Sequence, residues 1–227
     1  MTSYIFVILL ALIASFYYFF VKNNKKEYDH THRLIFVLLF MVLVLEIIGE
    51  YTAQYAYNNS LFYNLLFVYL ESCMIFYFFW MIYEEKHIKK AIAYAIVIYV
   101  AFGIIVSVFF QPIHLEFHNF SYAFGSMFII ILAIKFFMDV FNLKRYGDKN
   151  LLSIPYFWIV TVILFFYSAT FFYFTPIRLL YDIDKSLIQP LSIIIQFLAG
   201  LMYTVFGLSF YAPYFFREKY EVEWILY

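Results

Sequence analysis

Residues 45–73 read LEIIGEYTAQYAYNNSLFYNLLFVYLESC and join the end of one strongly apolar run to the start of the next. The turn between the runs, around QYAYNNS, carries no lysine or arginine. Three glutamates, Glu46, Glu50 and Glu71, lie in or beside these runs. A charged group is costly to bury in an apolar environment unless it is paired or hydrogen-bonded, so this stretch raises two questions. One is which solvent surrounds the runs, and the other is what the acids do there.

The composition of the whole chain answers the first question. The chain has 227 residues, of which 66% are hydrophobic, 26% are aromatic and only 13% are charged. Soluble domains average about 45–50% apolar and about 25% charged residues, so a membrane is the solvent that the composition predicts. The single cysteine, Cys73, cannot form an internal disulfide. No glycine-rich phosphate loop, zinc-ligand spacing or long basic tract is present, so we expect no cofactor, metal or nucleic acid.

Seven apolar runs are long enough to cross a bilayer as helices, which requires about 20 residues. They cover roughly residues 4–21, 34–53, 61–83, 91–110, 120–141, 154–174 and 187–211. Only helices or closed barrels satisfy the backbone in lipid, and these runs are too long for barrel strands. The predicted fold is therefore all-α: a polytopic membrane protein with one seven-transmembrane helix bundle spanning residues 1–227.

The first run could be confused with a signal peptide. It begins Met-Thr-Ser without a basic segment, its apolar stretch exceeds the usual length of about 7–15 residues, and no clear small-residue cleavage site precedes the basic cluster. We therefore expect an uncleaved first span.

Basic residues alternate between the predicted loops. Twelve of the 15 lysines and arginines lie in the first, third and fifth loops and the C-terminal tail. The second and fourth loops contain none, and the sixth contains two, Arg178 and Lys185. Short cytoplasmic loops are enriched in these residues. The pattern predicts that the N-terminus is outside and the C-terminus is cytoplasmic.

The glutamates share helix faces with other polar or small residues. Glu46 and Glu50 are four residues apart and lie on one face beside Gly49, which would let a neighbouring helix approach closely. Asn64 and Glu71 are seven apart and fall on one stripe of an α-helix. The seventh run has a stripe of small and polar residues: Ser192, Gln196, Gly200, Tyr203 and Gly207.

Depth in the membrane follows from a rise of about 1.5 Å per residue. Glu46, Glu71 and Gln196 lie about 10, 15 and 13 Å below the outer ends of their helices, and Glu50 and Asn64 lie about 5 Å below. All five therefore share the outer half of the bilayer. Because ionisable groups at this depth usually face the bundle interior, we predict an outward-facing polar pocket between the second, third and seventh spans. The prediction assumes that these spans are neighbours.

Structural interpretations of the same residues remain open. Glu71 could be a buried acid that only fixes helix register, and Glu50 could be solvated near the interface. Lys135 and Asp139, four residues apart in the fifth span, are expected to form an intramembrane ion pair, although the lysine could also extend to the interface. His114 and His118 lack a clear third ligand, so we assign no metal site. The seventh span contains no lysine that could carry retinal.

The second and third spans resemble a pattern in small seven-helix bacterial membrane proteins that have no assigned activity. The residues that carry the resemblance are Glu50, Asn58, Asn59, Tyr63, Asn64 and Glu71. The resemblance implies a bacterial inner (plasma) membrane as the location and transfers no site residue to this chain.

Without a nucleophile–base pair, the sequence favours a non-enzymatic protein that senses or binds a small molecule, a lipid or a protein partner. The alternative is a small proton- or ion-coupled transporter or channel, because proton relays use intramembrane acids. A membrane enzyme that uses the acids is the third hypothesis. The expected partners are the lipid bilayer, a small ligand and either a second membrane protein or another copy of the chain.

Overall fold

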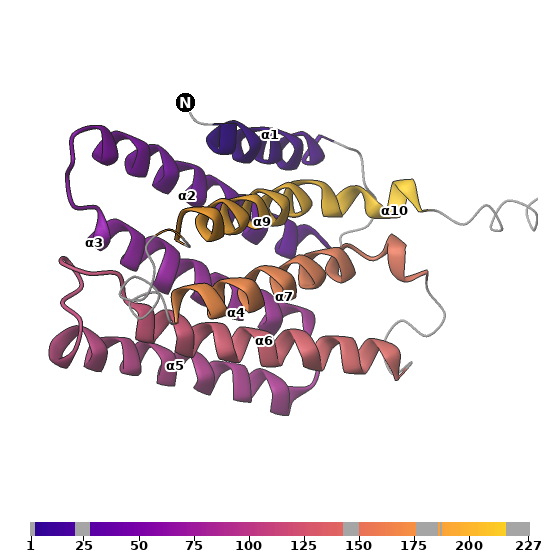
Figure 1. The fold of residues 1–227 in the computed structure, drawn as a ribbon. Helices are drawn as coiled ribbons and strands as arrows, with labels where there is room; N and C mark the ends of the chain where they lie inside the picture. The colour runs from indigo at the N-terminus through magenta and orange to yellow at the C-terminus, as the bar shows by residue number, and fades with distance from the viewer. Residues whose placement is uncertain (1–2, 21–27, 143–149, 176–185, 187, 217–227) are drawn as a thin grey trace, which may run out of the picture.

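The computed structural model describes residues 3–20, 28–142, 150–175, 186 and 188–216, and it contains no strand within them. Figure 1 shows the long helices running side by side as a bundle. The long helices are α1 (Ser3–Tyr18), α2 (Asp29–Gln54), α4 (Ser72–Ile82), α5 (Lys86–Phe109), α6 (Asn119–Phe141), α7 (Pro155–Phe174) and α9 (Ile188–Leu208). The short ones are α3 (Ser60–Phe62), η2 (Tyr63–Glu71), η3 (Leu151–Ser153), η5 (Ser209–Tyr211) and α10 (Ala212–Phe215).

The predicted all-α membrane fold is confirmed in its coarse form. Six helical segments of the described chain are long and apolar enough to cross a membrane, so the chain is an integral membrane protein. The third of the predicted spans is a continuous run through α3, η2 and α4, and the last runs from α9 through η5 to α10. Helix α1 has 16 residues and is about 24 Å long, shorter than the roughly 30 Å hydrocarbon core.

Several helices begin earlier than the apolar runs. Helix α2 starts at Asp29 and α5 at Lys86, each five residues before the predicted span. In α2 the added turn contains an ion pair in which Arg33 Nη2 lies 2.8 Å from Asp29 Oδ2. Hydropathy marks the part of a helix that suits lipid, whereas charged residues can continue the same helix into the interface. The two helices therefore extend beyond the predicted apolar spans by these charged turns.

Helices α2 and α6 organise the packing. Helix α2 contacts α1, η2, α4 and α9, while α6 contacts α4, α5 and α7. Helix α7 also packs against α9, which closes the bundle. The third span lies between α2 and α6, and large apolar side chains fill the interior around it. Fully buried members include Phe76, Phe78, Phe79, Phe136 and Phe206.

The N-terminal part of the third span is a π-helix. Residues Tyr63–Glu71 form η2, and the Ser72 N–H, just beyond it, bonds to Tyr69 O. The Val68 carbonyl accepts a 2.5 Å hydrogen bond from the Tyr99 hydroxyl on α5. A side-chain donor that enters the backbone ladder is a recognised cause of local helix distortion. π-Helices are rare and occur frequently at functional sites, so this segment marks a region of interest.

Tyrosine rings pack directly against glycines of neighbouring helices. A Cβ atom at Gly49 would meet the Tyr63 hydroxyl at 2.3 Å, and one at Gly103 would meet the Tyr69 ring at 2.4 Å. Small residues allow this kind of close approach in membrane bundles. The face of α2 that contains Gly49 therefore points inward, as the sequence predicted, and its neighbour there is η2.

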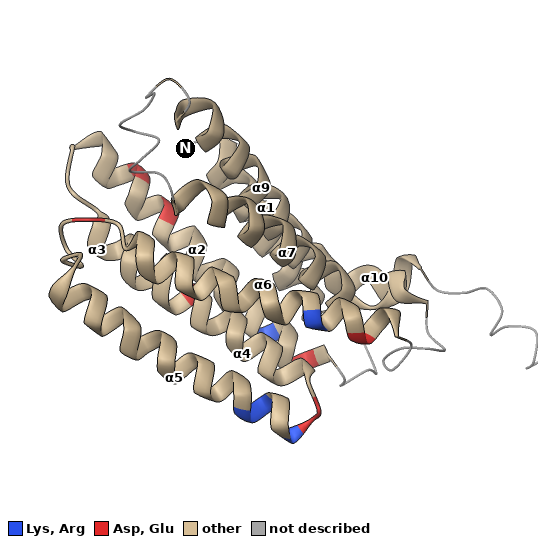
Figure 2. Ribbon diagram, turned by 60° about the horizontal axis from the view of Figure 1, so that its bottom comes forward, with Lys and Arg blue, Asp and Glu red and all other residues tan. Residues whose placement is uncertain are grey.

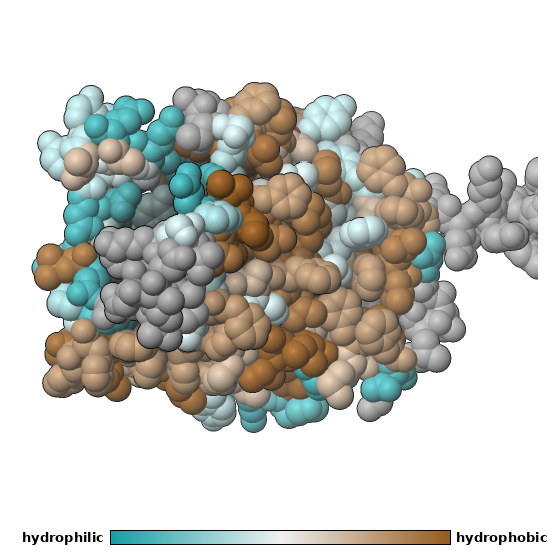
Figure 3. Space-filling view, viewed as in Figure 1, coloured by the Kyte–Doolittle hydropathy of each residue, from teal (hydrophilic) through white to brown (hydrophobic). Residues whose placement is uncertain are grey.

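The outer surface of the bundle suits lipid. Large apolar side chains are strongly exposed, among them Phe172 at 74%, Phe197 at 69% and Phe165 at 66%. Figure 2 shows how few charged residues the helices carry. In Figure 3, hydrophobic side chains cover much of the visible face, and hydrophilic ones gather near the end where α2 leads to α3.

The glycines of α9 give a matched test of this packing. A Cβ at Gly207 would meet the Ala11 carbonyl oxygen of α1 at 2.4 Å, whereas one at Gly200 would meet side-chain atoms of Tyr4 and Val7 at 3.8 Å. Backbone atoms cannot move aside as a flexible side chain can. The clash should therefore make Gly207→Ala lower the free energy of unfolding by about 1–3 kcal/mol. Gly200→Ala should be neutral or stabilising, since alanine favours helices by roughly 0.5–1 kcal/mol. Thermal unfolding in detergent measures both variants, and equal effects would contradict the α1–α9 contact.

Candidate functional site

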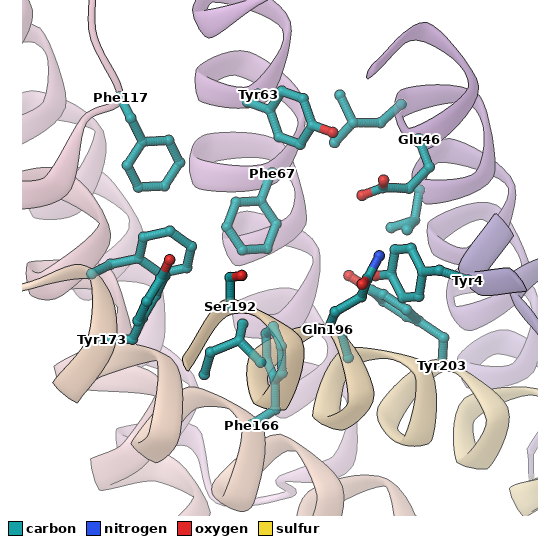
Figure 4. A pocket seen from close by; sticks show the side chains of 15 residues that line it. Tyr4, Glu46, Tyr63, Phe67, Phe117, Phe166, Tyr173, Ser192, Gln196 and Tyr203 are labelled. Atoms are coloured by element: carbon teal, nitrogen blue, oxygen red, sulfur yellow. The ribbon is translucent and has the colours of Figure 1, made fainter. Parts of the chain in front are cut away.

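A cavity of about 430 Å³ lies between α1, α2, η2, α7, α9 and the loop before α6. Figure 4 shows the side chains that line it. More than half of them are aromatic: Tyr4, Tyr63, Phe67, Phe117, Phe166, Tyr173, Phe174 and Tyr203. The others are Val42, Leu45, Glu46, Ser192, Ile195, Gln196 and Ala199. Ligand sites in proteins have volumes of about 300–1,000 Å³ and are mainly apolar with a few polar groups, and this cavity fits that description.

One end of the cavity carries its acid. Glu46 projects from α2 and Gln196 from α9, and both side chains are directed into the cavity in Figure 4. Tyr63, from η2, extends its hydroxyl toward the same carboxylate. The ion pairs found within the described residues, Arg33–Asp29 and Lys135–Asp139, do not involve Glu46. The carboxyl group of Glu46 therefore faces the cavity without a basic partner in the described chain.

The base of the cavity is closed by a hydrogen bond between α9 and the third span. Tyr203 lines the cavity, and its hydroxyl donates to Glu71, lying 3.1 Å from Oε1 and 3.3 Å from Oε2. Glu71 is fully buried, and Tyr203 is 2% exposed. A buried polar group without a partner is costly, so this bond fixes α9 against the third span at that depth.

The other end of the cavity is aromatic. Phe67 of η2, Phe117 of the loop before α6 and Phe174 of α7 form mutual ring contacts with centroids 4.9–6.3 Å apart. These distances suit edge and offset ring packing. The cavity thus has two chemically different ends, one with Glu46 and Gln196 and one made mainly of phenylalanine rings, with the Tyr173 hydroxyl among them.

The structure brings together part of the predicted polar pocket. Glu46 and Gln196 line the cavity, and Glu71 lies directly behind Tyr203. The assumed adjacency is present: α2 packs against both η2 and α9, and the Tyr203–Glu71 bond connects α9 to the third span. Glu50 does not line the cavity and is half-buried on α2.

Asn64 has a different role from the one predicted. It is fully buried, and its amide nitrogen donates to Ile113 O at 2.8 Å and to Glu116 O at 2.7 Å. Its Oδ1 accepts from the His118 N–H at 2.9 Å. Asn64 therefore holds the loop that carries Phe117 against η2. The i→i+5 bonding of a π-helix adds residues to each turn, so residues seven apart no longer share the stripe that an α-helix gives them.

The predicted ion pair is present in α6, away from the cavity. Lys135 Nζ contacts both carboxylate oxygens of Asp139, one turn along the helix. Asp139 is 8% exposed and the lysine is half-buried. Neither residue lines the cavity, so the pair serves to neutralise a buried acid rather than to build the site.

The two loop histidines are in different environments. His114 is exposed, whereas His118 is fully buried with Nδ1 2.6 Å from the Tyr69 hydroxyl. Burial lowers the pKa of His118 below its usual value, because removal from water disfavours the charged imidazolium. Within the described residues no group of three or more His, Cys, Asp or Glu side chains could hold a metal ion.

Most of the aromatic lining could not be identified from the sequence. The chain contains 24 tyrosines and 32 phenylalanines, so an aromatic residue in a span carries little information by itself. Tyr203 is the exception, since it belongs to the polar stripe of the seventh span. Tyr4 lies in a span without an ionisable neighbour, and no sequence signal distinguishes it from the rest.

The Tyr203–Glu71 bond leads to a stability test. Tyr203→Phe removes the donor and leaves the buried acid without its partner, which should cost about 1–3 kcal/mol of unfolding free energy. Tyr173→Phe is the matched control, because that tyrosine also lines the cavity but its hydroxyl makes no hydrogen bond within the described residues. Chemical or thermal unfolding in detergent should separate the two variants. Indistinguishable stabilities would refute the role given to the bond.

The site therefore consists of one carboxyl group and one amide on facing helices, above a buried acid–tyrosine bond.

Comparison with protein-family models, with curated proteins and with solved structures finds no match for this chain.

Proposed function

We propose that this protein is a non-enzymatic membrane receptor or binding protein that takes a small molecule into the cavity between α2, η2, α7 and α9. One observation carries the proposal: Glu46 and Gln196 project from facing helices into a cavity of about 430 Å³ whose other walls are largely aromatic. A mainly apolar pocket with a few convergent polar groups is the usual form of a small-molecule site.

The proposal includes seven crossings with the N-terminus outside. It is supported by the distribution of lysine and arginine along the sequence, since 12 of the 15 lie in the first, third and fifth loops and the C-terminal tail and only two lie in the second, fourth and sixth loops. Glu46 lies in the last three turns of α2, and Gln196 lies in the first three turns of α9. With this orientation both residues are in the outer half of the membrane and the cavity opens outward.

The surroundings of the protein follow from the same proposal. The exposed apolar helix faces suit the lipid bilayer, and the resemblance of the second and third spans favours a bacterial inner membrane. A second membrane protein, or another copy of this chain, would be the partner that receives a signal from the bound state.

A proton- or ion-coupled transporter or channel is the second candidate. The cavity leads to the Tyr203–Glu71 bond, and a buried acid below a cavity is a component of proton relays. Beyond Glu71, however, the interior contains the fully buried Phe76, Phe79 and Phe206. No hydrogen bond found within the described chain continues from Glu71 toward the opposite end. The binding function therefore has the stronger support.

Ligand-dependent stability tests the binding function. A panel of small cations, anions and neutral aromatics should include compounds that raise the thermal midpoint of the purified protein. At a concentration a hundredfold above Kd, binding stabilises by about 2.7 kcal/mol, or roughly 5–10 °C for a chain of this size. Ala199→Phe places a ring in the cavity and should abolish the shift, because Ala199 lines it. Equal shifts in both proteins would show that the compounds bind elsewhere.

Flux in sealed vesicles separates the two candidates. A receptor reconstituted alone should move neither protons nor solutes above the level of empty vesicles. A robust proton flux that disappears in Glu71→Gln and persists in Glu84→Gln would replace the proposed function with the transporter. Glu84 is an exposed residue between α4 and α5, and it provides the same chemical change far from the cavity.

A further inference from the structure

We propose that the ligand of this cavity is a small organic ammonium ion with an apolar body, an inference that rests on the proposed binding function. The cavity holds one carboxyl group, Glu46, and no lysine, arginine or histidine among the residues of the described chain that line it. An anionic ligand would meet a like charge there and no compensating cation from the described lining residues. A cationic ligand would supply the basic partner that Glu46 lacks within the described chain.

The aromatic residues near Glu46 favour an ammonium ion over an inorganic cation. In Figure 4, Tyr4, Tyr63 and Tyr203 project into the same end of the cavity as the carboxyl group. The faces of aromatic rings attract cations, and cages of such rings are the usual means of recognising quaternary ammonium groups. A metal ion would require several hard oxygen ligands instead, and no group of three or more suitable side chains is found in the described residues.

The polar neighbours can accept hydrogen bonds from a protonated amine. The Gln196 side-chain carbonyl and the Ser192 hydroxyl both line the cavity on α9. A carbonyl or hydroxyl oxygen accepts from N–H, so primary to tertiary ammonium ions gain an extra contact that a quaternary ion lacks.

The opposite end defines the rest of the ligand. Phe67, Phe117, Phe166 and Phe174 line it with hydrocarbon, and Tyr173 adds one hydroxyl group there. The cavity of about 430 Å³ has room for an aromatic or branched alkyl group in addition to the ammonium head. Burying that group supplies binding free energy in proportion to the apolar area removed from water. The two ends together match a cationic amphiphile of modest size.

Phenyltrimethylammonium and its neutral isostere tert-butylbenzene test the inference, because they have nearly the same shape and differ in charge. Benzoate serves as the anionic comparison. Equilibrium binding and thermal midpoints would be measured on the purified full-length protein in one detergent. We expect the ammonium probe to bind at least about tenfold more tightly than the isostere, the difference expected from a desolvated charge pair with cation–π contacts. Benzoate should not bind.

Substitutions assign the effect to the cavity. Glu46→Gln keeps the size of the side chain and should remove most of the preference for the ammonium probe, while binding of tert-butylbenzene stays unchanged. Tyr4→Leu removes a ring face near Glu46 and should weaken the ammonium probe by about threefold to tenfold without a comparable effect on the isostere. Glu84→Gln, at an exposed site remote from the cavity, should behave as the unmodified protein. Unchanged ligand-free midpoints would show that the variants are folded.

The outcomes separate this inference from the proposed function. If the isostere binds as tightly as the ammonium probe and Ala199→Phe blocks both, the cavity is a ligand site but the inference about charge is overturned. If the ammonium preference persists in Glu46→Gln, the cation binds elsewhere and the inference is also overturned. If neither probe binds, the ammonium class is excluded, and the proposed function is judged by the wider panel of compounds.

Discussion

A fully buried acid in the middle of an apolar bundle is the constraint on which the arrangement of the other helices depends. Glu71 must have a hydrogen-bond donor, because an unpaired polar group is costly inside protein and lipid. Tyr203 provides that donor, and the bond fixes the depth at which α9 meets the third span. Helix α9 is also held by α1, whose backbone lies against Gly207, one turn along α9 from Tyr203. The base of the cavity results from these contacts.

The π-helix is the second element that shapes the site. It redirects the residues before Glu71, so that Asn64 faces the loop ahead of α6 while Tyr63 and Phe67 face the cavity. The Asn64 side chain holds this loop through two donated hydrogen bonds and one accepted one, and the loop in turn supplies Phe117. A single distorted segment thus determines both a wall of the cavity and the position of the adjoining loop.

The sequence predicts the all-helical membrane fold well, because the hydropathy of a segment directly indicates whether lipid or water surrounds it. It also gives similar depths for Glu46, Gln196 and Glu71 from regular α-helical geometry, but that their helices are neighbours had to be assumed. The placement of Asn64 could not be predicted, because the distortion of η2 involves the Tyr99 hydroxyl, a contact from another helix. The aromatic residues that line the cavity could not be predicted either. Aromatic residues are abundant throughout the chain, and only the helix packing determines which of them face the cavity. The helix starts at Asp29 and Lys86 lie outside the apolar spans that hydropathy identifies, because charged turns can continue a helix outside lipid.

The central claim is that Glu46 and Gln196 face a cavity that opens to the outer side of the membrane. Its most direct test is the reaction of Gln196→Cys with a membrane-impermeant maleimide in sealed right-side-out vesicles, with Cys73 replaced by alanine. His87→Cys, exposed at the start of α5, marks the opposite side. The account predicts that the Gln196→Cys protein is labelled in sealed vesicles and the His87→Cys protein only after permeabilisation. Labelling of the Gln196→Cys protein only after permeabilisation would contradict the outward-facing cavity.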